Sequence, residues 1–278
     1  YTGGLTIISE DRKTFTHFSA DKNNPGALQD EKIVELFIDS RQRLWVGTLE
    51  AGLSLFLPKE SKFIHYEASA ESHTLNHNEV ETITEDSAGI IWVGTDNGLS
   101  KMVDAHSPIP QNIFQNHQHE PLDKQSLLSN SVKIVYVDSR NSLWVGTYFG
   151  GINVYNSKLL KFHTVRQKPW LKQTLSYNNV TAFAEDKDGN LWIGTDGKGI
   201  LVFNGKEIIQ EITVADGMLS NYISFINIDN EHNVWIGTNK GLNKYDKKRQ
   251  QFYTYTNKMG YKGIESKLNA TYKDNTGD

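Results

Sequence analysis

Apolar residues in this chain fall into short runs that are separated by polar or glycine-containing segments. Residues 180–186 form one such run, and residues 191–195 and 199–203 follow it after turns. A fourth kind of run alternates aromatic and polar residues, as in residues 252–256. Runs of this length, bounded by turn signals such as Asp188-Gly189, predict β-strands. We therefore expect units of four short strands.

One five-residue phrase, an apolar residue followed by Trp, Val or Ile, Gly and Thr, recurs along the chain. Its copies end at Thr48, Thr95, Thr147, Thr195 and Thr238. The tryptophans of these copies are Trp45, Trp92, Trp144, Trp192 and Trp235. They are spaced by 47, 52, 48 and 43 residues. Units of about 40–50 residues built from short strands are typical of β-propeller blades.

The repeated pattern extends on both sides of each tryptophan. An aspartate stands six residues before it, at Asp39, Asp86, Asp138, Asp186 and Asp229. A β-branched residue stands twelve before it, at Ile33, Val80, Val132, Val180 and Ile223. Gly-Leu or Gly-Ile begins six or seven residues after it, at Gly52, Gly98, Gly151, Gly199 and Gly241. Five copies of so long a pattern do not arise by chance.

The two ends of the chain match the inside of the repeat. Residues 1–5 match residues 148–152, while Asp274 and Gly277 match Asp186 and Gly189. We predict an all-β chain, a β-propeller of four-stranded antiparallel blades, with five nearly complete blades and two half-blades. Residues 1–278 form a single propeller fragment, with repeats at about 1–29 (half), 30–76, 77–128, 129–176, 177–220, 221–264 and 265–278 (half).

The recurring residues have structural roles in this interpretation. A buried tryptophan offers a large apolar plate to the neighbouring blade. The glycine two residues later leaves room for a close neighbour, and the aspartate accepts amide hydrogens of the following turn. One blade cannot bury both faces of its sheet, so blades stack radially. We assign none of these repeated residues to chemistry.

Residues 180–200, VTAFAEDKDGNLWIGTDGKGI, resemble the two-component regulator propeller repeat. The resemblance covers essentially the whole chain, although Gln42, Asn141 and His232 replace the turn glycine. The sequence of residues 148–156, YFGGINVYN, is similar to sequences in the sensor halves of hybrid two-component systems of Bacteroidetes. In that family such repeats build periplasmic propellers, followed by a further β-domain, a membrane helix and a histidine kinase.

This resemblance implies an extracytoplasmic ligand-sensing module of a membrane-bound signalling protein, located in the periplasm and detecting a glycan breakdown product. The partners it implies are a small carbohydrate and a neighbouring propeller or β-domain of the same parent chain, with pairing of two copies into a homodimer. No cofactor follows from it. The alternatives are a protein-interaction scaffold, or a propeller-fold glycosidase or lyase. We expect no enzymatic activity from this fragment and assign no catalytic residue, because no pair of carboxylates is marked by the pattern.

The amino-acid composition excludes several classes of protein and site. The formal net charge is −4, from 29 Lys and Arg against 33 Asp and Glu. This net charge provides no overall electrostatic attraction to nucleic acid. No apolar run approaches the roughly 20 residues that cross a bilayer, so we expect no direct membrane insertion by this fragment. The chain has no cysteine, which excludes disulfides and cysteine–zinc sites.

A ligand is expected at the end of the blades that carries the D-to-A and B-to-C connections. The candidate residues hold one register but vary between repeats. They are Glu50, Asp96, Asn97, Tyr148, Phe149, Trp170, Asp196, Lys198, Tyr222, Asn239 and Lys240. Tyr148 and Phe149 could stack on a sugar ring or cover a neighbouring blade, and the loop residue Trp170 could bind ligand or cap a sheet edge. Asparagines also recur in the D-to-A connections, where they are expected to cap loop backbone, at Asn78, Asn130, Asn178 and Asn221.

We assign no metal site. Residues 116–120, NHQHE, place His117 and His119 on one side of a strand. No third ligand can be identified from the sequence, so structural roles are expected for these histidines. Convergent aromatic, amide and acidic side chains at the loop end would favour a sugar as ligand. A broad apolar patch there would favour a protein partner.

Overall fold

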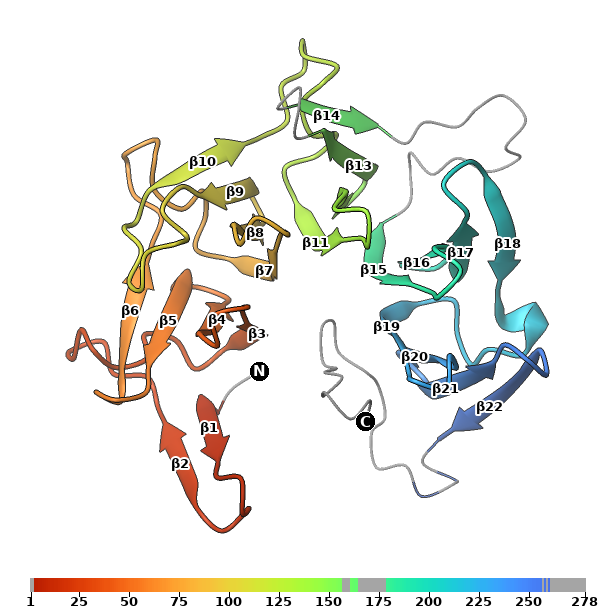
Figure 1. The fold of residues 1–278 in the computed structure, drawn as a ribbon, viewed down its shortest axis with the longest axis horizontal. Coiled ribbons are helices and arrows are strands. Elements are labelled where there is room, and N and C mark those ends of the chain that lie inside the picture. Colours follow the sequence, from red (N-terminus) through yellow and green to blue (C-terminus); the bar gives the residue numbers. More distant parts are fainter. Residues whose placement is uncertain (1–2, 157–160, 165–178, 257, 259, 261–278) are drawn as a thin grey trace. The chain divides into compact units, whose positions relative to one another are not determined.

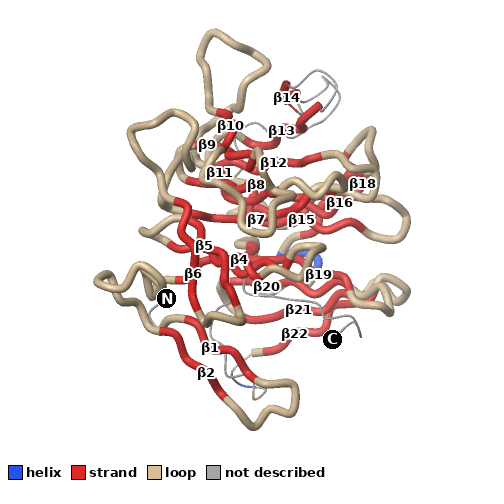
Figure 2. The backbone as a smooth tube through the Cα atoms, turned by 60° about the vertical axis from the view of Figure 1, so that its left-hand side comes forward, coloured by secondary structure: helices blue, strands red, loops and turns tan. Residues whose placement is uncertain are grey.

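The computed structural model describes residues 3–156, 161–164, 179–256, 258 and 260. Nearly all regular structure in this part is β-strand, and the only helix described there is a single 3-10 turn at Val214–Asp216 (Figure 2). None of the described helices has the length and apolar character that a membrane crossing requires. The chain forms two compact units, residues 1–135 and 136–278.

The first unit contains a two-stranded sheet and two four-stranded sheets (Figure 1). The two-stranded sheet consists of β1 (Leu5–Ile8) and β2 (Phe15–Phe18). The next consists of β3 (Ile33–Ile38), β4 (Leu44–Thr48), β5 (Leu53–Leu57) and β6 (Lys62–Tyr66). The third consists of β7 (Val80–Glu85), β8 (Ile91–Thr95), β9 (Gly98–Met102) and β10 (Phe114–His117).

Two four-stranded sheets lie wholly within the second unit, and the strand that opens a third, β11, spans the boundary between the units. That third sheet consists of β11 (Val132–Val137), β12 (Leu143–Thr147), β13 (Gly151–Asn156) and β14 (Lys161–Thr164). The others are β15 (Val180–Glu185), β16 (Leu191–Thr195), β17 (Ile200–Phe203) and β18 (Ile208–Ile212), and β19 (Ile223–Ile228), β20 (Val234–Thr238), β21 (Gly241–Asp246) and β22 (Gln251–Tyr255).

Each four-stranded sheet keeps its strands in chain order, and the paired neighbours run antiparallel. This is the up-and-down blade of a β-propeller, which confirms the predicted fold class. The two-stranded β1–β2 sheet is the predicted first half-blade. The predicted second half-blade, residues 265–278, lies outside the described residues.

Trp45 and Trp192 pack between neighbouring blades, as predicted. Trp45 is fully buried in a cluster that includes Val80 and Val93 of the following blade. Trp192 is 1% exposed and lies in a cluster with Ile223 and Ile236 of the next one. Apolar contact between adjacent sheets is therefore the main cohesive force within each unit.

Each of the five tryptophans also donates its indole N–H to the aspartate six residues before it, at 2.9–3.0 Å. The second carboxylate oxygen of that aspartate accepts backbone N–H groups of the turn, as Asp186 does from Asp188 and Asn190 at 3.0 Å. The predicted turn lock is therefore present, and it also satisfies the one polar group of a buried indole.

Candidate functional site

The threonine that ends each repeated phrase shapes the loop that follows it. In all five blades its Oγ1 donates to the carbonyl of the glycine that opens strand C, at 2.8–3.2 Å. Two or three variable residues lie between this threonine and this glycine. The hydrogen bond closes the B-to-C loop tightly, so the variable side chains project from a fixed base.

The asparagines of the D-to-A connections cap backbone, as predicted. The Oδ1 atoms of Asn78, Asn130 and Asn221 accept the N–H groups of Ala68, His119 and Val214 at 2.6–2.9 Å. Asn178 lies outside the described residues. These amides hold the loops that surround the candidate site.

Tyr148 and Phe149 form an exposed aromatic pair at the loop end of the β11–β14 blade. Their ring centroids are 4.1 Å apart, and 37% of Tyr148 and 68% of Phe149 is exposed. Phe149 adopts a φ of +60°, a left-handed conformation that is costly for a bulky residue. Its N–H donates to Oδ1 of Asn179 at 2.8 Å, which helps to hold this conformation. This unfavourable backbone conformation therefore accompanies exposure of the apolar Phe149 ring to solvent.

Asp196 and Tyr222 continue this surface across the next two blades. Asp196 Oδ2 accepts from Nδ2 of Asn179 at 3.4 Å, and Asp196 forms an isolated β-bridge with Tyr222. Tyr222 is 52% exposed. A side chain at Gly197 would meet the Tyr222 ring at 3.6 Å, so the glycine leaves this ring uncovered from that side.

We call Tyr148, Phe149, Asn179, Asp196 and Tyr222 the loop-end aromatic site. Hydrogen bonds and a β-bridge connect its members from the β11–β14 blade to the β19–β22 blade. The sequence predicted four of the five. It assigned no ligand role to Asn179, whose signal is its place one residue before strand A, opposite the aromatic loop of the preceding blade. Lys198 lies on the same B-to-C loop as Asp196 and is exposed.

The candidates in the first unit form hydrogen bonds and ion pairs with residues of neighbouring loops. Glu50 forms an ion pair with Lys32, and its N–H donates to Asp30 at 2.8 Å. Asp96 accepts from the hydroxyl of Ser131 at 2.6 Å. Asn97 accepts through Oδ1 from Asn130 at 3.3 Å and through its carbonyl from Asn76 and Gln118. The contacts of Glu50, Asp96 and Asn97 therefore connect and stabilise the loops around them.

Two further candidates, Asn239 and Lys240, lie exposed on the B-to-C loop of the β19–β22 blade. The N–H of Lys240 donates to Thr238 Oγ1 at 3.2 Å, so this loop is built like the others. Trp170 lies outside the described residues.

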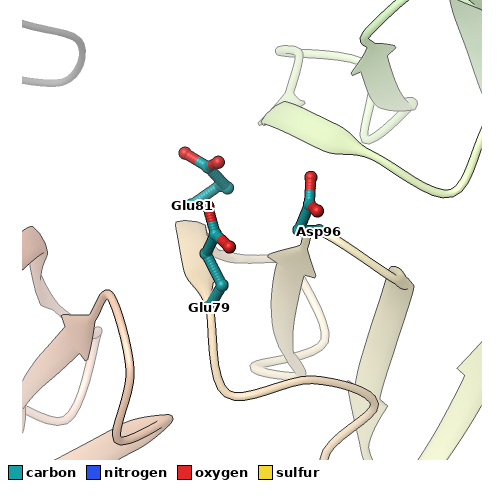
Figure 3. Close-up of side chains that lie close together, drawn as sticks. All are labelled: Glu79, Glu81 and Asp96. Carbon is teal, nitrogen blue, oxygen red and sulfur yellow. The ribbon is translucent and has the colours of Figure 1, made fainter.

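Glu79, Glu81 and Asp96 bring three carboxylates together on the β7–β10 blade (Figure 3). The Lys133 ammonium forms an ion pair with Glu81 and lies 3.5 Å from Asp96. Burial, followed by the charges of Asp96 and Glu81, raises the pKa of Glu79. Lys133 thus lies against two of the three carboxylates, which is the arrangement of a structural ion-pair network.

The two histidines of residues 116–120 have structural surroundings. His117 stacks on Trp92 with ring centroids 6.0 Å apart, and burial followed by the charge of Lys101 lowers its pKa to about 4. Nδ1 of His119 lies 2.7 Å from the carbonyl of Leu127. These contacts place one ring against the blade core and the other on a loop.

Tandem four-stranded antiparallel blades define the chain as a β-propeller. The model of the two-component regulator propeller matches residues 74–97, 126–149 and 174–197. These three stretches thus match the two-component regulator propeller repeat, the resemblance that the sequence predicted.

Similar proteins agree with this assignment. The chain is 27% identical over 217 residues to histidine kinase P4 of Formosa agariphila, covering 76% of this chain and 15% of that protein. It is 23% identical, with a TM-score of 0.54, to the extracellular domain of a protein described as a hybrid two-component system of B. thetaiotaomicron. That match covers 91% of this chain and 35% of the other.

A virginiamycin B lyase of Staphylococcus aureus, in a catalytically inactive form with quinupristin, has a TM-score of 0.68 at 14% identity. This match covers 95% of this chain and 80% of the lyase. At these identities the solved structures show the shared fold alone. The chain spans 15% of the kinase and about a third of the hybrid-system domain.

Proposed function

We propose that this chain is the ligand-sensing part of a membrane-bound signalling protein, lies on the extracytoplasmic side of the membrane, and binds a carbohydrate of the kind released by glycan breakdown. The match to the two-component regulator propeller supports the sensing role. The similar proteins named as a histidine kinase and as an extracellular domain support the setting.

The observation that carries the carbohydrate proposal is the composition of the loop-end aromatic site. Tyr148, Phe149 and Tyr222 are exposed rings, and Asn179 and Asp196 place an amide and a carboxylate between them. Sugar rings present apolar C–H faces edged by hydroxyl groups. Aromatic faces pack on the former, while amide and carboxylate groups hydrogen-bond the latter.

Signalling would then follow from occupancy. A bound sugar stabilises one arrangement of the blade loops, and the free energy of binding shifts the population of states in which the module packs against a neighbouring propeller, a β-domain or a second copy. No chemical step is required.

The test is a thermal-shift screen of the chain against oligosaccharides, followed by variants. We expect one glycan class to raise the melting temperature of the native chain. Phe149→Ala and Asp196→Asn should each weaken binding about tenfold, which corresponds to the loss of one good contact. Phe15→Ala is the matched control, because Phe15 is 64% exposed on β2 outside the site.

The proposal fails if no glycan shifts the melting temperature. It also fails if Phe149→Ala and Phe15→Ala bind the active glycan with the same affinity as the native chain, since binding would then occur elsewhere.

A further inference from the structure

Two of the junctions between neighbouring blades are closed by the same polar contact. The N–H and Oγ of Ser40, in the A–B turn of the β3–β6 blade, donate to Glu85 at 2.6 and 2.8 Å. Ser139 makes the same pair of hydrogen bonds to Glu185, at the same distances. We call this contact the serine–glutamate clip.

An arginine follows each clip serine and lies against the next blade. Arg140 donates to the carbonyl of Gly189 at 3.0 Å, and its guanidinium also approaches Gly205 in the C–D turn. Arg41 lies near the carbonyl of Gly89 in the same way, at 3.5 Å. In both junctions a cation therefore fills the space between the A–B and C–D turns of the following blade.

The junction between the β15–β18 and β19–β22 blades lacks both elements. Lys187 and Asp188 stand where the two clipped junctions have serine and arginine, and Ile228 stands where those junctions have glutamate. A pocket of about 210 Å³ lies at this junction. Its lining comprises Lys187 of the earlier A–B turn together with Glu231, His232, Asn233, Lys247 and Lys248 of the later blade.

The lining of this pocket carries three lysines, Lys187, Lys247 and Lys248, and one carboxylate. Nζ of Lys247 forms an ion pair with Oδ2 of Asp186 at 2.7 Å and lies 3.5 Å from Oδ2 of Asp188. The structure records no acidic partner for Lys187 or Lys248 within the described part of the chain. Glu231, the one carboxylate in the lining, accepts from Asn233 Nδ2 at 3.2 Å.

We propose that this pocket, hereafter the junction pocket, binds a tetrahedral oxyanion, a sulfate or phosphate group. Lys187 and Lys248 donate charge-assisted hydrogen bonds to it from the two blades. The anion thereby joins the blades where the serine–glutamate clip is missing. The pocket is larger than a bare oxyanion, so it accommodates the group either as a free ion or attached to a sugar.

The test is calorimetric titration of the chain with sodium sulfate, sodium phosphate, galactose 6-sulfate and galactose at constant ionic strength. We expect both ions or the sulfated sugar to bind and galactose not to bind at this site. Lys187→Gln with Lys248→Gln should weaken binding about tenfold or more. Lys13→Gln with Lys59→Gln removes the same charge from exposed positions and should leave the affinity unchanged.

Tighter binding of galactose 6-sulfate than of sulfate identifies a sugar-borne group, and equal binding identifies the free ion. Equal affinity in both double variants, or no binding of any anion, overturns the proposal. The result is independent of the loop-end aromatic site, because Phe149→Ala should leave anion binding at the junction pocket intact.

Discussion

At the scale of single residues, the glycine of the repeated phrase lies against a residue of the next blade at Gly47, Gly94 and Gly194. A Cβ at Gly47 would lie 2.6 Å from Val80, and one at Gly94 would lie 2.7 Å from Val132. The neighbour is in each case the β-branched residue that stands twelve before the next tryptophan. The glycine and the branched residue therefore form one complementary pair across a blade junction.

Gly194→Ala tests this pair. Its new methyl group would lie 2.7 Å from Ile223 and 3.0 Å from Ala182, closer than real Cβ contacts allow. We expect the free energy of unfolding to fall by about 1–3 kcal/mol, as for other overpacked cores. Urea denaturation followed by tryptophan fluorescence measures it. Gly26→Ala is the control, because its neighbour there is the flexible Lys62 side chain.

The sequence could predict these residues but not all of their contacts. The aspartate was predicted as a turn lock and the tryptophan as an inter-blade plate, since each follows from its chemistry. The indole–carboxylate bond was not predicted. Trp192 and Asp186 are six residues apart in the chain, and only the observed register and rotamers bring their polar atoms to 3.0 Å.

At the scale of blades, polar clips add to apolar packing. Glu185, the last residue of β15, accepts two hydrogen bonds from Ser139 in the A–B turn of the preceding blade. Charge-assisted bonds of this kind are stronger than neutral ones. They fix how one blade is rotated against the next.

A double-mutant cycle measures the clip. Glu185→Ala should destabilise the chain by about 1–3 kcal/mol, and its coupling to Ser139→Ala should be about 1 kcal/mol. Chemical denaturation of the four variants gives both values. Glu60→Ala, on the exposed β5–β6 turn, should have no comparable effect, and a coupling near zero would show that the clip contributes nothing.

Strand positions were largely predictable, and contacts between blades were not. Predicted strands 191–195 and 199–203 agree with β16 (Leu191–Thr195) and β17 (Ile200–Phe203). The register shift between Val180 and Ala182 was not foreseen. Tyr148 and Phe149 were predicted as site residues because they are aromatic residues at variable positions of a B-to-C loop. Their partner Asn179 comes from the next blade, and such a neighbour depends on how blades pack.

At the scale of the whole molecule, Asp39, Asp186 and Asp229 link stability to pH. Burial alone would raise the pKa of Asp186, but hydrogen bonds from Lys247, Trp192 and Asn190 lower it to about 2. The pKa values of Asp39 and Asp229 are lowered in the same way against the effect of burial, with Trp45 and Asn233 among the donors. Each such carboxylate stabilises the folded chain only while it is ionised.

Acid titration should therefore unfold the chain. The folded pKa of Asp186 lies below its ordinary value of 3.8, so its contribution is complete above about pH 4 and is lost as the pH falls toward 2. That contribution is about 2 kcal/mol. Circular dichroism against pH should show a transition in this range, and Asp186→Asn should move its midpoint upward. An unchanged midpoint would contradict the linkage.

The serine–glutamate clip gives the chain a second, longer period. The clip joins the blades of Trp45 and Trp92 and those of Trp144 and Trp192, and successive clips are separated by 99 or 100 residues along the chain. A duplication or loss of one blade would place a donor serine opposite Val137 or Ile228. Insertion or deletion of two neighbouring blades together would keep each donor serine opposite an acceptor glutamate.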